Sequence, residues 1–269
     1  MYTPRHFQMP AELQQRLLAA PGVGDLITHG PDGLLATHLP YVFDEAMGEH
    51  GSLVLHVARP NVQWRHEGEA LFIITAASDY ISSLWYPSAE ESGKYVPTWD
   101  YVTLHLYGRL ITHDDLAWTT MAVERLMGVH ESRVGLDDMP QDYLGGQLRA
   151  IVGLQLEVTR IEAKAKLSQN RTPDDVRGVI EGLDSVGADD MSALVHEYAL
   201  PAAEARAALD ESTALLDAAL GGAASLPGIS DVRDAFVSAA ESLTSGVDSA
   251  STEAARNAVS TACAAFTGQ

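Results

Sequence analysis

The alternation of apolar and polar residues over 101–111 limits the fold of this chain more than any other feature. Val102, Leu104 and Leu106 fall on one side of an extended segment, whereas Thr103 and His105 fall on the other. Successive side chains of a β-strand point to opposite faces, so this period of two predicts a strand with one face in a core. The sequence therefore predicts a sheet at the centre of the fold.

Other segments repeat this pattern or are short apolar runs bounded by turn residues. The segment 24–43 predicts a hairpin around the turn Gly-Pro-Asp-Gly at 30–33. Further strands are predicted over 52–58, 70–75 and 152–162. Helices are predicted over 114–131 and over 172–182, where a threonine cap precedes a proline. Five or six short antiparallel strands with a few helices predict an α+β, mainly β fold, a β-barrel with flanking helices.

The composition changes near residue 184. All four tryptophans and every lysine precede it, and the remainder holds 13 acidic residues against 3 arginines. Alanine and leucine recur at helical spacing over 201–222, and further helices are expected over 226–244 and 251–266. We therefore expect a barrel domain over 1–183 and an acidic, alanine-rich helical tail over 184–269, with partial disorder of the tail as the alternative.

The charge of the chain argues against nucleic acid as a direct partner. The formal net charge is −20 and the 17 basic residues form no cluster, whereas phosphate binding depends on clustered lysine and arginine. No window approaches 18 uninterrupted apolar residues, and the first ten residues lack the apolar core of a signal peptide. We expect a cytoplasmic protein with no membrane-spanning segment.

The familiar catalytic patterns of serine hydrolases, zinc proteases, P-loop NTPases and dinucleotide-binding folds do not occur in this sequence. Polar clusters with aromatic neighbours stand out instead, at 36–40, 56–64, 79–87, 96–101 and 166–171. Aromatic bodies with hydrogen-bonding tips are typical of pockets that hold a flat ligand with an anionic edge. These clusters are therefore the candidate site.

His56 is the sharpest candidate because it lies inside an apolar run and is followed at once by Arg59, Asn61 and Trp64. Three roles are open for its imidazole. It could be a core group that bonds a backbone carbonyl, a hydrogen-bond partner of a cofactor, or a metal ligand.

Eight segments occur in an order that resembles the PaiB family, whose members are labelled FMN-binding negative transcriptional regulators. The segments are MYTPRHF, ATHLP, HVARPN, YISSLWYP, VPTWDY, HLYGRL, IVGLQLEVTRIEAKAKLSQNR and GVIEGL. They cover residues 1–183, and the tail lies outside the resemblance. The resemblance implies an FMN-binding split barrel that forms a homodimer and places its cofactor near the subunit interface.

The resemblance leaves the cofactor open, since relatives of this fold use FMN, a deazaflavin or haem. Some PaiB-like proteins resemble piperazate synthases, haem enzymes that close an N–N bond in an N-hydroxylated ornithine. Haem b bound through His56 is our preferred expectation, and FMN in an oxidoreductase or a transcriptional regulator is the alternative. The expected partners are a small-molecule substrate and a second copy of the chain.

If these residues face a cofactor, their chemistry suggests a role for each. His56 would ligate haem iron, and Arg59 would bind a propionate or phosphate, with Asn61 in the same motif. Lys166 and Arg171 would contact the same anionic groups, and Ser168 and Gln169 a ring edge. Trp85 and Trp99 are the indoles that could stack on the cofactor. The candidates for a catalytic base are His105, Lys166 and Asp100.

Three positions depart from the family pattern. Leu84 stands where a serine is usual, Asp100 where an asparagine is usual, and Ala165 where a tryptophan is usual. If these residues line the pocket, it is roomier, more apolar on one side and more acidic on another. We expect such a pocket to suit a porphyrin face better than a phosphate, and Asp100 to be able to hold the ammonium group of an amino-acid substrate.

Overall fold

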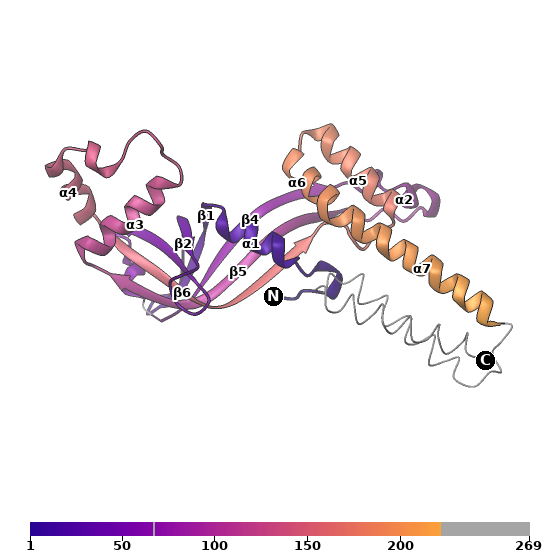
Figure 1. The fold of residues 1–269 in the computed structure, drawn as a ribbon, viewed down its shortest axis with the longest axis horizontal. Coiled ribbons are helices and arrows are strands. Elements are labelled where there is room, and N and C mark those ends of the chain that lie inside the picture. Colours follow the sequence, from indigo (N-terminus) through magenta and orange to yellow (C-terminus); the bar gives the residue numbers. More distant parts are fainter. Residues whose placement is uncertain (67, 222–269) are drawn as a thin grey trace, which may run out of the picture. The chain divides into compact units, whose positions relative to one another are not determined.

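The computed structural model describes residues 1–66 and 68–221, and residue 67 and residues 222–269 lie outside it. Six strands form a closed barrel in the order β1-β2-β3-β6-β5-β4 (Figure 1). The strands are β1 (Gly22–Gly30), β2 (Gly33–Asp44), β3 (Ser52–Ala58), β4 (Gly68–Ile81), β5 (Thr98–His113) and β6 (Ile151–Lys166). The expected mainly β barrel with flanking helices is confirmed.

The registers explain how the barrel closes. The predicted hairpin is β1 paired antiparallel with β2, from Gly30 opposite Gly33 to Gly22 opposite Tyr41. The other edge of β1 pairs with β4, and β3 joins β2 to β6. The inward side chains are fully buried leucines and a phenylalanine, as the period of two requires. They include Leu26, Leu55, Phe72, Leu104 and Leu154.

Helices and short helical turns connect the strands. The α-helices are α1 (Ala11–Ala19), α2 (Pro87–Ser92), α3 (Leu116–Gly128), α4 (Gln141–Arg149), α5 (Pro173–Val186), α6 (Asp189–Leu194) and α7 (Leu200–Gly221). The 3-10 turns are η1 (Arg5–Phe7), η2 (Val62–Arg65), η3 (Ser83–Trp85) and η4 (Leu136–Asp138), and η5 (Val195–Ala199) is a π-helix. Helices α3 and α5 correspond to the two predicted helices, whereas α1, α2 and α4 were not predicted.

The chain forms two compact units. The barrel unit comprises residues 1–3, 9–76 and 102–165. The second unit comprises residues 4–8, 77–101 and the chain from 166 onward. Strands β4, β5 and β6 each contribute residues to both units.

The second unit is built around α5. Thr172 caps this helix by accepting from the amide of Asp175, and Pro173 follows as its first residue. The helix continues past residue 183, where the sequence predicted a domain boundary, and ends at Gly187 with φ 75°. Helices α6 and α7 pack on α5 within the second unit, and the division into domains at residue 183 stays a prediction.

The tail is helical as far as the structure describes it. Helix α7 matches the helix predicted over 201–222. The helices predicted over 226–244 and 251–266 lie outside the described residues. No helix within 1–66 and 68–221 has the length and apolar character that a membrane crossing needs.

Candidate functional site

His56 lies on the outer face of the barrel wall. It follows Leu53 and Leu55, which point into the core, and in the register of β3 with β6 it faces Gly153. A side chain at Gly153 would collide with the indole of Trp118 from α3. Helix α3 packs on β3, so the strand segment that carries His56 is covered from outside by that helix.

The imidazole of His56 has an unusual environment. It is half-buried, and its Nδ1 atom is buried without a hydrogen-bond partner among the residues that the structure describes. Burial lowers the pKa of His56, so the neutral ring is favoured. An unpaired buried nitrogen costs free energy, so the carbonyl-bonded role that we considered for His56 does not describe this ring.

A polar network lies on the same outer face. The ring of His113 stacks on Trp118 with centroids 4.1 Å apart. His113 Nε2 bonds Gln155 Oε1 at 3.2 Å, and Gln155 donates to Ser52 Oγ at 3.0 Å. His56 takes no part in this chain of hydrogen bonds, so its unpaired nitrogen stands out among paired neighbours.

The guanidinium of Arg59 forms hydrogen bonds with other residues of the protein. Its Nη1 and Nη2 atoms donate to the two carboxylate oxygens of Asp114 at 3.0 and 2.6 Å, and Nε donates to the carbonyl of Arg149 at 2.8 Å. The guanidinium correspondingly lowers the pKa of Asp114. The carboxylate of Asp114 binds the planar fork of Arg59 in this structure, and the predicted contact of Arg59 with a propionate or phosphate stays a prediction.

Asn61 also has a structural role. Its side chain accepts from the amide of Gln63 at the start of η2 and donates to Thr37 Oγ1 at 3.0 Å. Trp64 donates to the carbonyl of Arg59. The motif that follows His56 therefore shapes the turn after β3, and within the motif His56 Nδ1 and Gln63 Oε1 are buried without a hydrogen-bond partner among the described residues.

The other predicted residues gather in the second unit around Asp100. This aspartate is fully buried, and its carboxylate accepts from Lys166 Nζ at 2.9 Å and from Ser168 Oγ at 2.6 Å. Lys166 also donates to Thr98 Oγ1 at 2.8 Å and to the carbonyl of Trp99. The predicted base candidates Lys166 and Asp100 thus form a buried ion pair with each other.

Burial raises the pKa of Asp100, and the ammonium group of Lys166 and the hydroxyl of Ser168 oppose that rise. A carboxyl with a raised folded-state pKa stabilises the fold most below its unfolded pKa of 3.8, and this contribution is lost as the pH rises through the folded value. We expect the unfolding free energy of the wild type, relative to that of Asp100→Asn, to fall as the pH rises from about 3 to 7. Urea titrations monitored by circular dichroism would measure this difference in unfolding free energy at each pH. A difference that does not change with pH would contradict the raised pKa of Asp100.

The turn after β6 holds the remaining motif residues. Ser168 has φ 64°, a left-handed conformation that is uncommon outside glycine, and its hydrogen bond to Asp100 helps to hold it. Gln169 accepts from the amide of Leu167 through its side chain at 2.7 Å. Arg206 of α7 donates to the carbonyls of Gln169 and Arg171. Ser168 and Gln169 are therefore engaged in the turn itself, which differs from the predicted contact with a ring edge.

Arg171 is the cation of this motif that forms no salt bridge among the described residues, whereas Lys166 is paired with Asp100. The guanidinium of Arg171 lies over the ring of Tyr86, 4.4 Å from the centroid. Its charge is one of those that lower the pKa of Asp100 against the effect of burial. The hydroxyl of Tyr86 is buried and forms no hydrogen bond of normal geometry in the described part of the chain. Burial raises its pKa, and the nearby hydroxyl of Ser168 and guanidinium of Arg171 oppose that rise. Sequence reasoning missed Tyr86, although it lies within one of the family segments.

The two predicted indoles differ in exposure. Trp85 packs so closely on α5 that a side chain at Gly178 or Gly182 would collide with it. Trp99 is 56% exposed and meets Tyr80 edge to face with centroids 6.0 Å apart. Trp99 is therefore the indole that can still stack on a ligand.

His105 belongs to the barrel unit, whereas Lys166 and Asp100 belong to the second unit. Its ring lies 6.4 Å from that of Tyr107, and burial lowers its pKa, assisted by the terminal ammonium group and opposed by Glu162. The three predicted base candidates are therefore not brought together within one unit. Among the residues described, no group of three or more histidine, cysteine or acidic side chains could hold a metal ion.

The comparisons with known proteins point to one family. A family model described as "Putative FMN-binding domain" matches residues 1–160. The chain is 34% identical over 190 residues to "Protease synthase and sporulation protein PAI 2" of Bacillus subtilis, which covers 68% of this chain and 89% of the relative. It is 30% identical over 156 residues to an uncharacterized protein of Saccharomyces cerevisiae, covering 49% of this chain and 92% of that protein.

A solved structure also resembles the fold. The crystal structure of a conserved hypothetical protein from Mycobacterium tuberculosis aligns with a TM-score of 0.44 and 12% sequence identity. The alignment covers 62% of this chain and 91% of the other.

Proposed function

Because the chain belongs to the PaiB family of FMN-binding split-barrel proteins, we propose that it binds FMN and serves in redox chemistry. The observation that carries the proposal is Arg171, the guanidinium of a family motif that has no carboxylate partner in the described residues. A flavin phosphate is the kind of anion that such a planar fork binds well. The buried hydroxyl of Tyr86, which forms no hydrogen bond of normal geometry there, offers a second donor beside it.

The second unit also supplies a surface for a flat ring. The exposed indole of Trp99 and the phenol ring of Tyr80 form an aromatic pair. Aromatic side chains left exposed in a motif region are typical of surfaces that a ligand or partner covers. Arg171 and Tyr86 would hold the phosphate, Trp99 would lie against the ring system, and bound FMN would supply hydride or electron transfer.

The hydrogen-bonded network of Asp100, Lys166 and Ser168 supports the turn that carries Arg171. Its charges satisfy one another, and Arg206 fixes the turn that carries Arg171. A site positioned by such a network keeps its geometry without the ligand. We further propose a homodimer, as the family implies, which sedimentation velocity would test.

We expect FMN added to the purified protein to bind with quenching of its fluorescence and retention of two flavin absorption bands after gel filtration. Arg171→Gln is expected to weaken binding roughly tenfold or more, because a charge-assisted hydrogen bond is lost. Arg177→Gln is the matched control, because Arg177 pairs with Asp174 and Glu204 on the surface. Equal affinities of the two variants would contradict the role of Arg171, and a protein that fails to retain FMN would contradict the proposal.

His56 favours haem as a second candidate. Its half-buried neutral ring, with an unpaired nitrogen, has the chemistry of an axial ligand, and Arg59 would have to leave Asp114 to bind a propionate. In its most specific form this proposal is a piperazate synthase-like enzyme that closes an N–N bond in an N-hydroxylated ornithine. A Soret band that disappears in His56→Ala would favour haem over FMN, and its absence after haem reconstitution would exclude this candidate.

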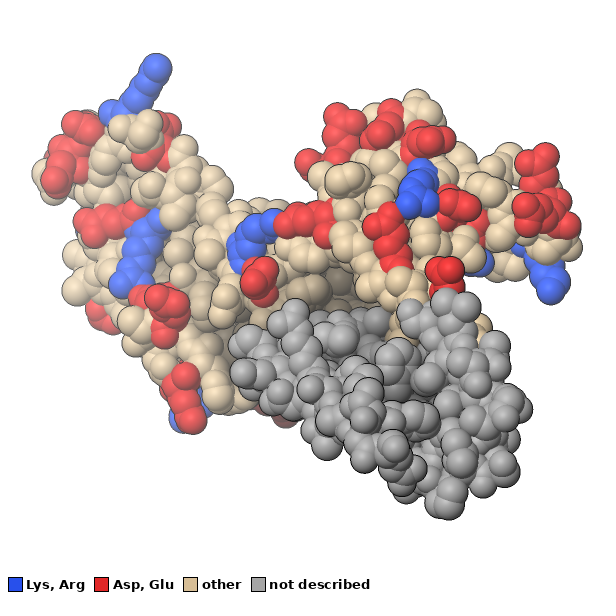
Figure 2. Space-filling view, turned by 45° about the vertical axis from the view of Figure 1, so that its right-hand side comes forward, with Lys and Arg blue, Asp and Glu red and all other residues tan. Residues whose placement is uncertain are grey.

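Direct nucleic-acid binding does not fit the surface of the molecule. On the face that Figure 2 shows, acidic side chains outnumber basic ones and the basic side chains are scattered. The net charge of −20 agrees with this view. A regulatory role as the family label suggests would therefore act through a protein partner.

A further inference from the structure

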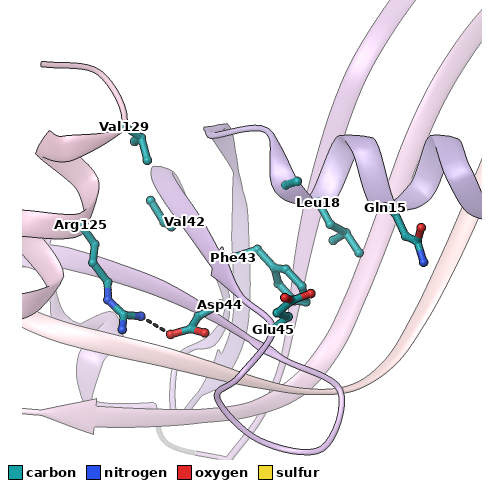
Figure 3. A pocket seen from close by; sticks show the side chains of 9 residues that line it. Gln15, Leu18, Val42, Phe43, Asp44, Glu45, Arg125 and Val129 are labelled. Carbon is teal, nitrogen blue, oxygen red and sulfur yellow. Dashed lines mark hydrogen bonds and ion pairs between the residues drawn. The ribbon is translucent and has the colours of Figure 1, made fainter. Parts of the chain in front are cut away.

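Arg206 of α7 binds backbone carbonyls, whereas an arginine of the barrel unit shows the more usual pairing with a carboxylate. Arg125 of α3 pairs with Asp44 of β2, and both residues line a hollow of about 780 Å³ (Figure 3). Arg206 instead donates from Nη1 to the carbonyl of Gln169 and from Nη2 to the carbonyl of Arg171. The planar fork of one arginine therefore bridges two backbone groups of a single turn.

The bridged turn, over 167–171, joins β6 to α5. A backbone hydrogen bond from the amide of Arg171 to the carbonyl of Ser168, at 2.9 Å, closes it. Ser168 has φ 64°, a conformation that persists in a non-glycine residue only where its surroundings hold it. Asp100 holds the first half of the turn by accepting from Ser168 Oγ, and Arg206 holds the second half. The two halves of the turn are thus fixed by different parts of the chain.

Arg171 is fixed at both of its ends. Its carbonyl accepts from Arg206, and its guanidinium lies over the ring of Tyr86, 4.4 Å from the centroid. A long side chain that is ordered only when a ligand arrives loses part of the binding free energy to that ordering. An arginine that is held in place beforehand avoids this loss, so it binds an anion more tightly.

Helix α7 is itself fixed close to Arg206. It packs on α5, and Arg177 of α5 donates to Glu204 at 2.5 Å. Ala203, in the first turn of α7, is fully buried. Since α5 begins directly after the turn over 167–171, α7 can hold that turn in a constant position.

We propose that Arg206 is a positioning residue for the phosphate of FMN, and that the preference of the site for FMN over riboflavin depends on it. This inference rests on the proposed function, because it requires Arg171 to bind the phosphate. Arg206 acts through the backbone of Arg171. Helix α7 follows the residues 1–160 that the family model matches, so a segment outside the matched domain contributes to the ligand specificity of the site.

Riboflavin separates this role from a general contribution to the fold, because it carries the ring system of FMN and lacks the phosphate. The full chain is titrated with each flavin, and the quenching of flavin fluorescence gives the two affinities. Arg206→Gln is expected to weaken FMN binding about fivefold and to leave riboflavin binding unchanged. Equal losses for both flavins would indicate a merely structural role and would overturn the proposal, as would an unchanged affinity for FMN.

A double-mutant cycle tests whether Arg206 acts through Arg171. Adding Arg206→Gln to Arg171→Gln is expected to cause no further loss of FMN affinity, because the group that Arg206 positions is already gone. A further loss as large as in the wild type would mean that the charge of Arg206 acts on the phosphate directly, which would overturn the proposal. Arg206→Lys keeps the charge and a hydrogen-bond donor, so it is expected to weaken FMN binding by only about twofold. It also serves for the comparison of the two flavins if Arg206→Gln does not fold.

Arg177→Gln is the matched control. It removes an equal charge and the ion pair between α5 and α7, but it leaves the carbonyls of the turn untouched. Exposed ion pairs contribute little to stability, so both flavin affinities are expected to stay unchanged. If the wild type retains FMN and Arg206→Gln binds both flavins equally well, this inference alone fails. A wild type that does not retain FMN would contradict the proposed function itself.

Discussion

Replacing Asp100 by alanine is expected to lower the free energy of unfolding by about 3 kcal/mol at neutral pH, because the buried ammonium of Lys166 loses its counter-charge. Asp100 is fully buried and the side chain of Lys166 is 19% exposed, so solvent screens the pair weakly. Ser168 loses the acceptor that helps to hold its left-handed backbone. Urea unfolding monitored by circular dichroism and by tryptophan fluorescence would measure the loss.

Two controls separate the ion pair from mere truncation. Asp100→Asn keeps an oxygen that can accept from Ser168 or Lys166, so we expect it to lose less stability than Asp100→Ala. Lys166→Met combined with Asp100→Ala is expected to lose less than the sum of the single variants, because no uncompensated charge remains. Additive losses, or a loss below about 1 kcal/mol for Asp100→Ala, would contradict a paired network.

Replacing Gly178 by alanine is the second large effect that we expect. A Cβ atom at this position of α5 would collide with the backbone carbonyl oxygen of Trp85, which cannot rotate away as a flexible side chain can. Overpacking of this kind costs about 1–3 kcal/mol, and contact with backbone places this site towards the upper end. The measurement is again the unfolding free energy in urea.

Gly146→Ala is the matched control for this substitution. Gly146 lies within the short helix α4, is exposed and has open space where a Cβ would stand. Alanine favours a helix over glycine by about 0.5–1 kcal/mol, so this variant is expected to be stabilised slightly. Opposite signs for the two substitutions would establish the close approach of α5 to η3, whereas a neutral Gly178→Ala would contradict it.

The strands could be predicted because the alternation of apolar and polar side chains indicates which face of each strand is buried. The alternation around Leu104 and Leu106 located β5, and the Gly-Pro-Asp-Gly turn located the β1–β2 hairpin. The second half of β4 was not predicted, since Ala76 to Tyr80 offers little apolar alternation. Helix α4 was missed because Gly145 and Gly146 give its sequence a low helix propensity.

The candidate site was predictable as a set of residues but not as a set of partners. Arg59 looked like a ligand for an external anion, and the structure supplies Asp114, 55 positions further along the chain. Asp100 looked like an added charge in a pocket, and it neutralises Lys166 instead. Nothing in the sequence specifies which oppositely charged group a long side chain meets, because the fold decides which groups lie close together in space.

The clamp of Arg206 on the carbonyls of Gln169 and Arg171 has a kinetic consequence. The turn that carries Arg171 lies beyond the residues 1–160 matched by the family model, and a helix further along the chain holds it. Whenever the first turns of α7 open, the turn loses these two hydrogen bonds and keeps those of Ser168 and Gln169, so its conformation is held less firmly while that helix is open. The dwell time of a ligand on Arg171 would then depend in part on how often a helix further along the chain opens.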